Sequence, residues 1–135
     1  MNTVKYYFWL LTQVYSAMVY YWYVTAIFFF IFIALAFLDI FKKKFQFNLS
    51  LKFIYPWLNP FIIVLWGAIF SSAKSQIIPG ILVYTCLVFP VIINLQSIFK
   101  VRENRYYTIG LVIFMEWISL MAVFISGMSI ANDWL

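Results

Sequence analysis

Histidine is absent from this 135-residue chain, and cysteine occurs once. The lack of histidine excludes His-based acid–base catalysis, haem ligation through histidine and most catalytic zinc sites. The single cysteine, Cys86, cannot form an internal disulfide, and its apolar surroundings are typical of a small core residue. The sequence also has no phosphate-binding glycine loop and no serine nucleophile elbow. We therefore predict a protein that is not an enzyme and that uses neither a metal nor a cofactor.

Charge is the second scarce property, because only 10% of the residues are charged whereas 67% are hydrophobic and 24% are aromatic. A soluble domain carries about a quarter charged residues, so lipid must be the main solvent of this chain. The net charge of +5 would suggest nucleic acid in a soluble protein. In a membrane protein this positive charge is better explained by orientation in the membrane and by contact with anionic headgroups. We therefore predict no nucleic-acid binding. We predict a multi-pass protein of a bacterial cytoplasmic (inner) membrane.

Four apolar stretches approach the length of about 20 residues that a bilayer crossing requires. They predict an all-α, single-domain protein in which residues 1–135 form a four-transmembrane-helix bundle, with spans at residues 18–40, 53–70, 77–99 and 106–130. A continuous helix from residue 5 to residue 41 would be roughly 55 Å long, which exceeds the bilayer core. Residues 4–16 are therefore predicted as an interfacial helix or an extension beyond the bilayer.

All four prolines lie within the predicted spans, and Pro79 is tolerated because it lies at the start of the third span. Pro90 should kink the third span, because proline removes a helical hydrogen bond. Pro56 and Pro60 leave two starts for the second span: a kinked helix from Phe53, or a helix that begins at Pro60 with Asn59 as its N-cap. We favour the kinked helix, because the alternative is short for a crossing.

Basic residues are distributed unequally between the predicted loops. Lys5 and Lys74 lie on one side, and seven lie on the other: Lys42, Lys43, Lys44, Lys52, Lys100, Arg102 and Arg105. The positive-inside rule places the seven in the cytoplasm and both termini outside. Residues 45–53 alternate apolar and polar side chains, which predicts an extended strip. The basic loops and this strip are predicted docking surfaces for anionic headgroups or a protein partner.

Glu116 lies near the middle of the last predicted span, about ten residues or roughly 15 Å of helix rise from its cytoplasmic end. An ionised carboxylate at that depth costs several kcal/mol unless it is paired. Asn59 and Asn94 are expected at a similar depth and are its natural partners. The three residues predict either inter-helix contacts, which we favour, or a proton- or cation-responsive site.

The same span carries a stripe of small residues at helical spacing: Ser119, Ala122, Ser126 and Ser129. Small residues let helix backbones approach closely in lipid. The stripe predicts a close helix interface, either inside the bundle or between subunits of a homo-oligomer, and the sequence leaves these alternatives equal.

These observations predict a non-enzymatic membrane subunit, sensor or immunity-type protein. It would act by oligomerisation, by docking a partner through its basic cytoplasmic loops, or by both. The alternative is a small ion, proton or solute channel or carrier that uses Glu116 with Asn59 and Asn94.

Overall fold

The computed structural model describes residues 2–43, 45, 51–71, 75–99 and 104–131, with the side chains of residues 51–53 and 96–98 left aside. Every secondary-structure element in these residues is a helix. The five helices are α1 (Thr3–Tyr20), α2 (Trp22–Phe41), α3 (Leu51–Ile69), α4 (Ile77–Phe99) and α5 (Arg105–Ala131). The last three lie within two residues of the ranges in which the sequence predicted the second, third and fourth spans.

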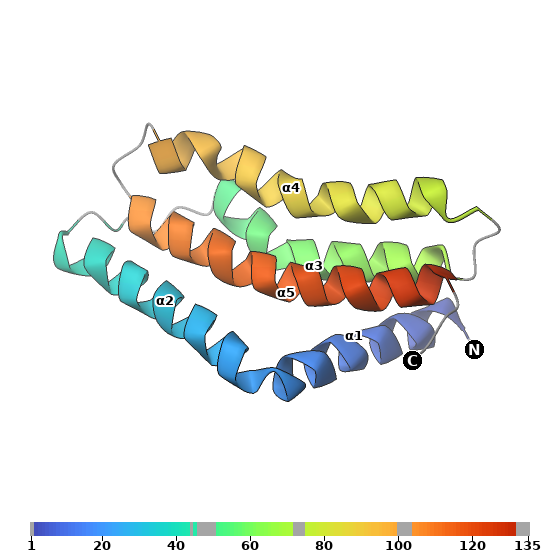
Figure 1. Cartoon of the computed structure of the whole chain (residues 1–135). Coiled ribbons are helices and arrows are strands. Elements are labelled where there is room, and N and C mark those ends of the chain that lie inside the picture. The colour runs from blue at the N-terminus through green and yellow to red at the C-terminus, as the bar shows by residue number, and fades with distance from the viewer. Residues whose placement is uncertain (1, 44, 46–50, 72–74, 100–103, 132–135) are drawn as a thin grey trace.

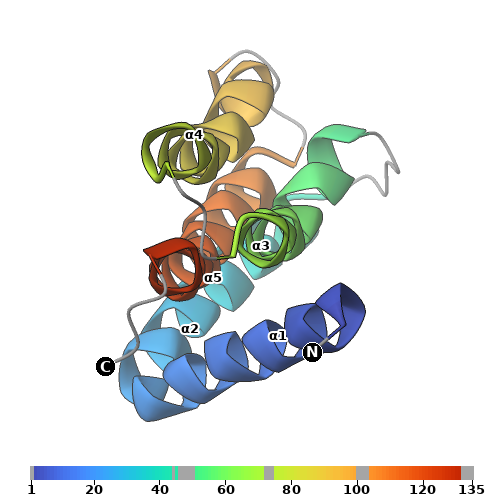
Figure 2. The same ribbon diagram turned by 90° about the vertical axis from the view of Figure 1, so that its right-hand side faces the viewer.

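The helices form an elongated bundle in which α5 contacts each of the other four. α3 and α5 run in the same direction, α4 and the α1–α2 pair run in the opposite direction, and both termini lie at one end (Figure 1). In the end-on view, α4 and α1 lie on opposite sides of the α3–α5 pair (Figure 2). The chain therefore runs along the bundle four times. We call each of these passes a leg, and the first leg consists of α1 and α2.

The first leg bends at Tyr21, between α1 and α2. Its residues contain neither glycine nor proline, and the N–H of Tyr21 still donates to the carbonyl of Ala17 at 3.0 Å. A straight helix over residues 3–41 would be about 58 Å long, whereas the 27-residue α5 is about 40 Å. The bend lets the longer leg follow the whole length of α5, and Leu10 and Val14 bury themselves against α3 and α5. α1 is thus packed on the bundle, and its place at or beyond the membrane surface stays a prediction.

Proline lies inside each of the next two helices, at Pro56 and Pro60 in α3 and at Pro90 in α4. α3 continues through Pro56 and Pro60, so the kinked helix and not the start at Pro60 describes the structure. Both views show the first turns of α3 inclined to the axis of its later turns (Figures 1 and 2). The residues from Leu51 onward are helical, so the predicted extended strip does not reach residue 53, and residues 46–50 lie outside the described part.

The core divides into two clusters along the bundle. One is mainly aliphatic and includes Leu10, Ile63, Val64 and Val83 from three helices packed on α5. The other lies between α2 and α5 and combines aromatic with aliphatic side chains, with the ring centroids of Phe32 and Phe114 stacked at 5.9 Å.

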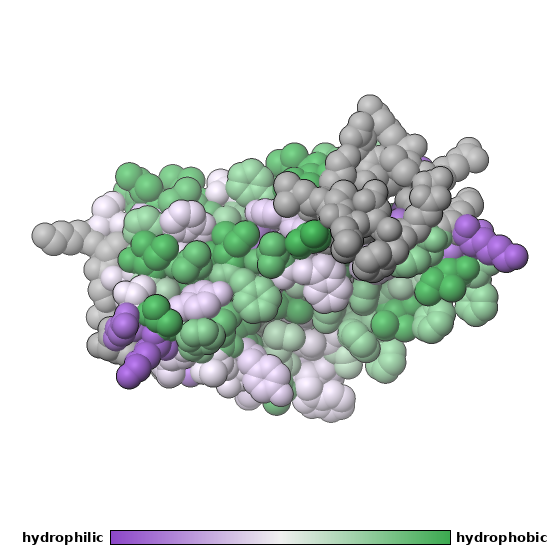
Figure 3. All heavy atoms as spheres, turned by 180° about the vertical axis from the view of Figure 1, so that it is seen from behind, coloured by the Kyte–Doolittle hydropathy of each residue, from purple (hydrophilic) through white to green (hydrophobic). Residues whose placement is uncertain are grey.

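Three helices in the described residues are long and apolar enough to cross a membrane: Trp22–Phe41, Ile77–Leu95 and Arg105–Ala131. α3 adds the shorter apolar stretch Ile54–Ile69. Strongly hydrophilic residues lie at the two ends of the molecule, with apolar and aromatic side chains between them (Figure 3). These properties are those of an integral membrane protein.

Candidate functional site

The interface between α3 and α5 carries most of the predicted polar and small residues. Ser119, Ala122, Ser126 and Ser129 are all fully buried. The Asn59 amide donates through Nδ2 to Ser119 Oγ at 3.0 Å, Ser126 Oγ donates to the carbonyl of Ile63 at 3.1 Å, and Ser129 Oγ donates to the carbonyl of Gly67 at 2.8 Å. The stripe is therefore used inside the chain's own bundle.

Gly67 marks a close approach of the two backbones. A Cβ built on Gly67 would lie 2.6 Å from Ser126 Cβ and 2.9 Å from Ser126 Cα. Such a contact is shorter than side chains tolerate, so only glycine fits this position on α3 without a shift of the helices. Close approach of this kind is what small residues provide between helices in lipid.

A hydroxyl chain ties α1 to the same interface. Tyr6 and Ser129 are joined by a hydrogen bond of 2.9 Å between their hydroxyl oxygens. Because Ser129 gives its proton to the carbonyl of Gly67, the tyrosine is the donor in this pair. One polar connection thus runs from α1 through α5 to α3 near the end of the bundle that holds both termini.

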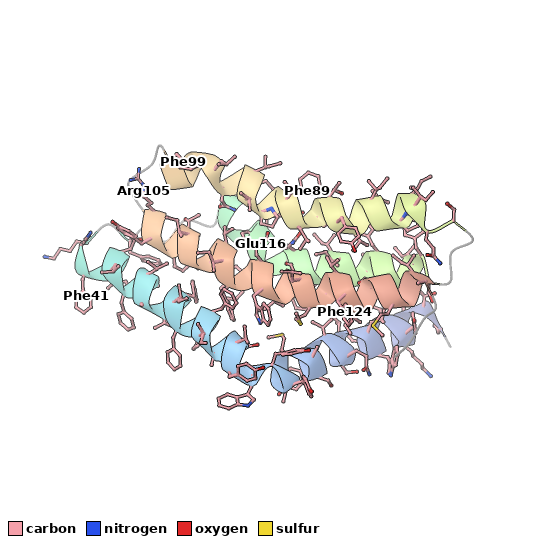
Figure 4. All side chains as sticks on the ribbon, viewed as in Figure 1. Phe41, Phe89, Phe99, Arg105, Glu116 and Phe124 are labelled. Atoms are coloured by element: carbon pink, nitrogen blue, oxygen red, sulfur yellow. The ribbon has the colours of Figure 1, made fainter. Side chains whose placement is uncertain are left out.

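Glu116 lies at mid-length of α5 (Figure 4). It is half-buried, and its Oε1 atom is buried without a hydrogen-bond partner among the described residues. The Tyr55 phenol of α3 lies within electrostatic reach of both Glu116 and Cys86 of α4. Glu116 therefore belongs to the region where α3, α4 and α5 meet.

The two asparagines predicted as partners of Glu116 are both buried, but each bonds elsewhere. Asn59 donates to Ser119, and its Oδ1 atom has no partner among the described residues. Asn94 donates to the carbonyl of Pro90 in its own helix at 2.8 Å. The structure brings Asn59 to the α3·α5 interface, one helical turn from Glu116, whereas Asn94 bonds back to the carbonyl one turn earlier in its own helix.

Asp39 is a polar residue that sequence reasoning passed over. It is fully buried, and its Oδ2 atom accepts the backbone N–H of Tyr107 at 2.7 Å. The residue before α5, Asn104, has a left-handed backbone (φ 55°). The carboxylate that caps the first turn of α5 is supplied by α2, and a negative charge there is favourable to the helix dipole. The sequence signal was an acid three residues before a run of lysines, which looked like a surface position.

Basic side chains gather at the end where α2 stops and α5 starts. Lys42 and Lys43 are exposed, and the Lys42 ammonium lies 4.8 Å from the centre of the Tyr106 ring. Arg105 donates to the carbonyl of Phe99 at 3.1 Å. Lys44, Lys100 and Arg102 lie outside the described residues, as does the side chain of Lys52, whose backbone is in α3. The described cations Lys42, Lys43 and Arg105 form what we call the basic end.

Two hollows open on the bundle surface away from Glu116. One, of about 350 Å³, is apolar and lies where α1 meets α2, beside Trp22 and Phe114. The other, of about 160 Å³, lies between α4 and α5 beside Gly80 and Gly127. The described residues contain no group of three or more His, Cys, Asp or Glu side chains placed to hold a metal ion.

Comparison of the chain with protein-family models, with curated proteins and with solved structures gives no match.

Proposed function

We propose that this chain is a non-enzymatic integral membrane subunit that acts by assembly, docking a partner through its basic end. The observation that carries the proposal is how the polar side chains are divided. Those inside the bundle bond one helix to another, as Asn59 does with Ser119 and Asp39 with Tyr107. The charges free to meet another molecule include the exposed Lys42 and Lys43 at one end.

The basic end suits an anionic surface in the cytoplasm. The positive-inside rule favours this orientation, with both termini outside. We propose a bacterial cytoplasmic membrane as the host. Anionic headgroups would hold the end at the membrane surface, and an acidic segment of a protein partner or of a second copy would compete for the same cations.

Charge reversal tests the proposal. The triple variant Lys42→Glu, Lys43→Glu, Arg105→Glu should lose a complex that the wild-type protein keeps in mild detergent, measured by light scattering as particle mass. Lys5→Glu, at the opposite end, is the matched control and should keep the complex. A wild-type particle that contains one 16.1 kDa chain and no other protein would contradict the proposal.

The orientation has its own test. Single cysteines at position 5 and at position 43, each in a Cys86→Ser background, report which end is outside. An impermeant thiol reagent applied to intact cells should label position 5 and leave position 43 unlabelled. The reverse labelling would overturn the orientation.

A second candidate function is a small ion, proton or solute channel or carrier. The unpartnered Oε1 atom of Glu116 favours it, because intramembrane acids frequently mark ion pathways. Proteoliposomes with a trapped pH dye test it: wild-type protein should dissipate a proton gradient and Glu116→Gln should not. Equal leak rates for the two proteins would remove this candidate.

A further inference from the structure

At the α3·α5 interface, which we call the α3·α5 seam, two buried oxygen atoms lack a hydrogen-bond donor among the described residues. They are Oδ1 of Asn59 and Oε1 of Glu116. An amide oxygen and an ionised carboxylate both accept hydrogen bonds, so neither can satisfy the other. A buried acceptor without a donor costs about 1–3 kcal/mol, and more where it is charged. Each of the two unpaired acceptors therefore carries a free-energy cost. One additional proton shared between them would remove both costs.

The register of the two helices places these groups within one helical turn of each other. α3 and α5 run in the same direction (Figure 1). Asn59 reaches Ser119 at 3.0 Å, and Ser119 is three residues, hence one helical turn, beyond Glu116. Tyr55, one turn before Asn59 on α3, is within electrostatic reach of Glu116. Glu116 is thus flanked on α3 by Tyr55 and Asn59.

No described cation faces Glu116. The titratable group within its electrostatic reach is Tyr55 on α3, which Cys86 on α4 also approaches, and neither of these carries positive charge. On its own helix the nearest base is Arg105, eleven residues or about 16 Å of rise away. On α2, Asp39 is bonded to Tyr107, about 14 Å of rise away, and the tyrosine of α1 that joins α5 does so at Ser129. A carboxylate left ionised in this setting costs several kcal/mol.

We propose that Glu116 is a carboxylic acid in the folded protein and that its hydroxyl donates to Oδ1 of Asn59. The α3·α5 seam is then a binding site for one proton. Binding adds a proton from water to one carboxylate oxygen, so charge is removed and an inter-helix hydrogen bond is gained. Loss of the proton leaves a carboxylate against an amide oxygen and weakens the seam at mid-membrane. The site does not depend on the assembly proposal, and it requires no conduction.

Thermal unfolding of the full chain in detergent, followed from about pH 5 to about pH 9, tests the site. The folded protein keeps a proton that the unfolded chain releases, so the wild-type midpoint should fall by roughly 4 °C as pH rises. Glu116→Gln retains an N–H donor for Asn59 and cannot titrate. It should match the wild type at low pH and lack this fall. Asp39→Asn is the control and should keep it.

Infrared spectroscopy keeps the test valid if Glu116→Gln folds poorly. Wild-type protein at pH 7 should show a carboxylic-acid C=O band that shifts in heavy water, and Asn59→Ala should move that band because its partner is lost. Absence of the band would overturn the proposal. So would a midpoint that rises with pH, which would mean a carboxylate accepting from the Asn59 amide. An unfolding midpoint that rises with added sodium at fixed pH would also overturn the proposal, because the site would then bind a metal cation in place of the proton.

Discussion

α5 packs against α3 and against α2 by different means. Towards α3 it presents small and hydroxyl-bearing residues, and the two backbones approach until Gly67 meets Ser126. Towards α2 it presents rings, with Phe28 stacked on Trp117 at 5.3 Å and Phe32 on Phe114. Between helices in lipid, close packing and hydrogen bonds provide the attraction that the hydrophobic effect cannot. The α3·α5 seam is therefore expected to hold the bundle, and the α2·α5 seam to adapt.

Burial differs in the same sense. In the most apolar 18-residue stretch of each helix, 56% is buried inside the protein for α5, against 11% for α2. Two specific bonds fix α2 all the same: Trp117 Nε1 donates to Thr25 Oγ1 at 3.0 Å, and Tyr107 donates to Asp39. α2 is thus a helix with most of its surface available to lipid, held to α5 near its two ends.

A series of glycine substitutions should give the largest difference between the α3·α5 and α2·α5 seams. Gly67→Ala forces a contact of 2.6 Å with Ser126, whereas Gly110→Ala meets the α2 backbone at 3.1 Å and Gly127→Ala meets nothing within 4 Å. We expect Gly67→Ala to lower the free energy of unfolding by about 3 kcal/mol, Gly110→Ala to lower it less, and Gly127→Ala to raise it slightly, because alanine is the better helix former. Thermal unfolding in detergent gives the order.

A second substitution checks the cause. Ser126→Gly removes the atom that the new Cβ would strike, so it should restore part of the stability lost in Gly67→Ala. If Gly67→Ala and Gly127→Ala were equally stable, the close α3·α5 approach would be wrong.

Asp39→Ala should have the next largest effect, because it removes the carboxylate that caps α5. We expect a loss of about 1 kcal/mol, with amide exchange faster in the first turn of α5 than elsewhere. Asp39→Asn keeps an acceptor without the charge and should fall between alanine and wild type. Unchanged exchange at Tyr107 in the alanine variant would show that the cap is not formed.

Thr25→Val should have the smallest effect. It leaves the Trp117 indole N–H without its acceptor, at a cost of roughly 0.6 kcal/mol for an inter-helix bond in a membrane protein. Thr85→Val is the matched control, because Thr85 is exposed and bonds only to the carbonyl of Leu82 in its own helix. Stability loss in the control equal to that in Thr25→Val would assign the effect to helix propensity.

Sequence periodicity and proline chemistry anticipated much of the fold. The apolar runs and basic boundaries located α4 and α5, and the shortness of a helix starting at Pro60 identified the kinked α3. The stripe from Ser119 to Ser129 was recognised as a close interface because small residues at three- and four-residue steps share a helix face. Which helix would occupy that interface could not be derived, because spacing within one helix says nothing of its neighbour.

Three features were missed or misplaced, and the first two depend on tertiary contacts. The bend at Tyr21 has no glycine or proline, so local rules gave no signal for it, and packing of α1 on α3 and α5 maintains it. Asp39 is buried because the start of α5 lies against it, and that position is 68 residues away in sequence. Asn94 turned to its own helix because the chain at Pro90 offers a nearby carbonyl.

The central feature of this structure is that the α3·α5 seam forms within one chain. The side chains of Asn59 and Ser119 meet at 3.0 Å, so Asn59→Cys with Ser119→Cys, in a Cys86→Ser background, tests this directly in native membranes. Oxidation, or a mercuric ion, should bridge the two thiols and leave a monomer on a non-reducing gel with no thiol open to maleimide. A covalent dimer would place the seam between subunits, and two unbridged thiols would mean that α3 and α5 do not pack in this register.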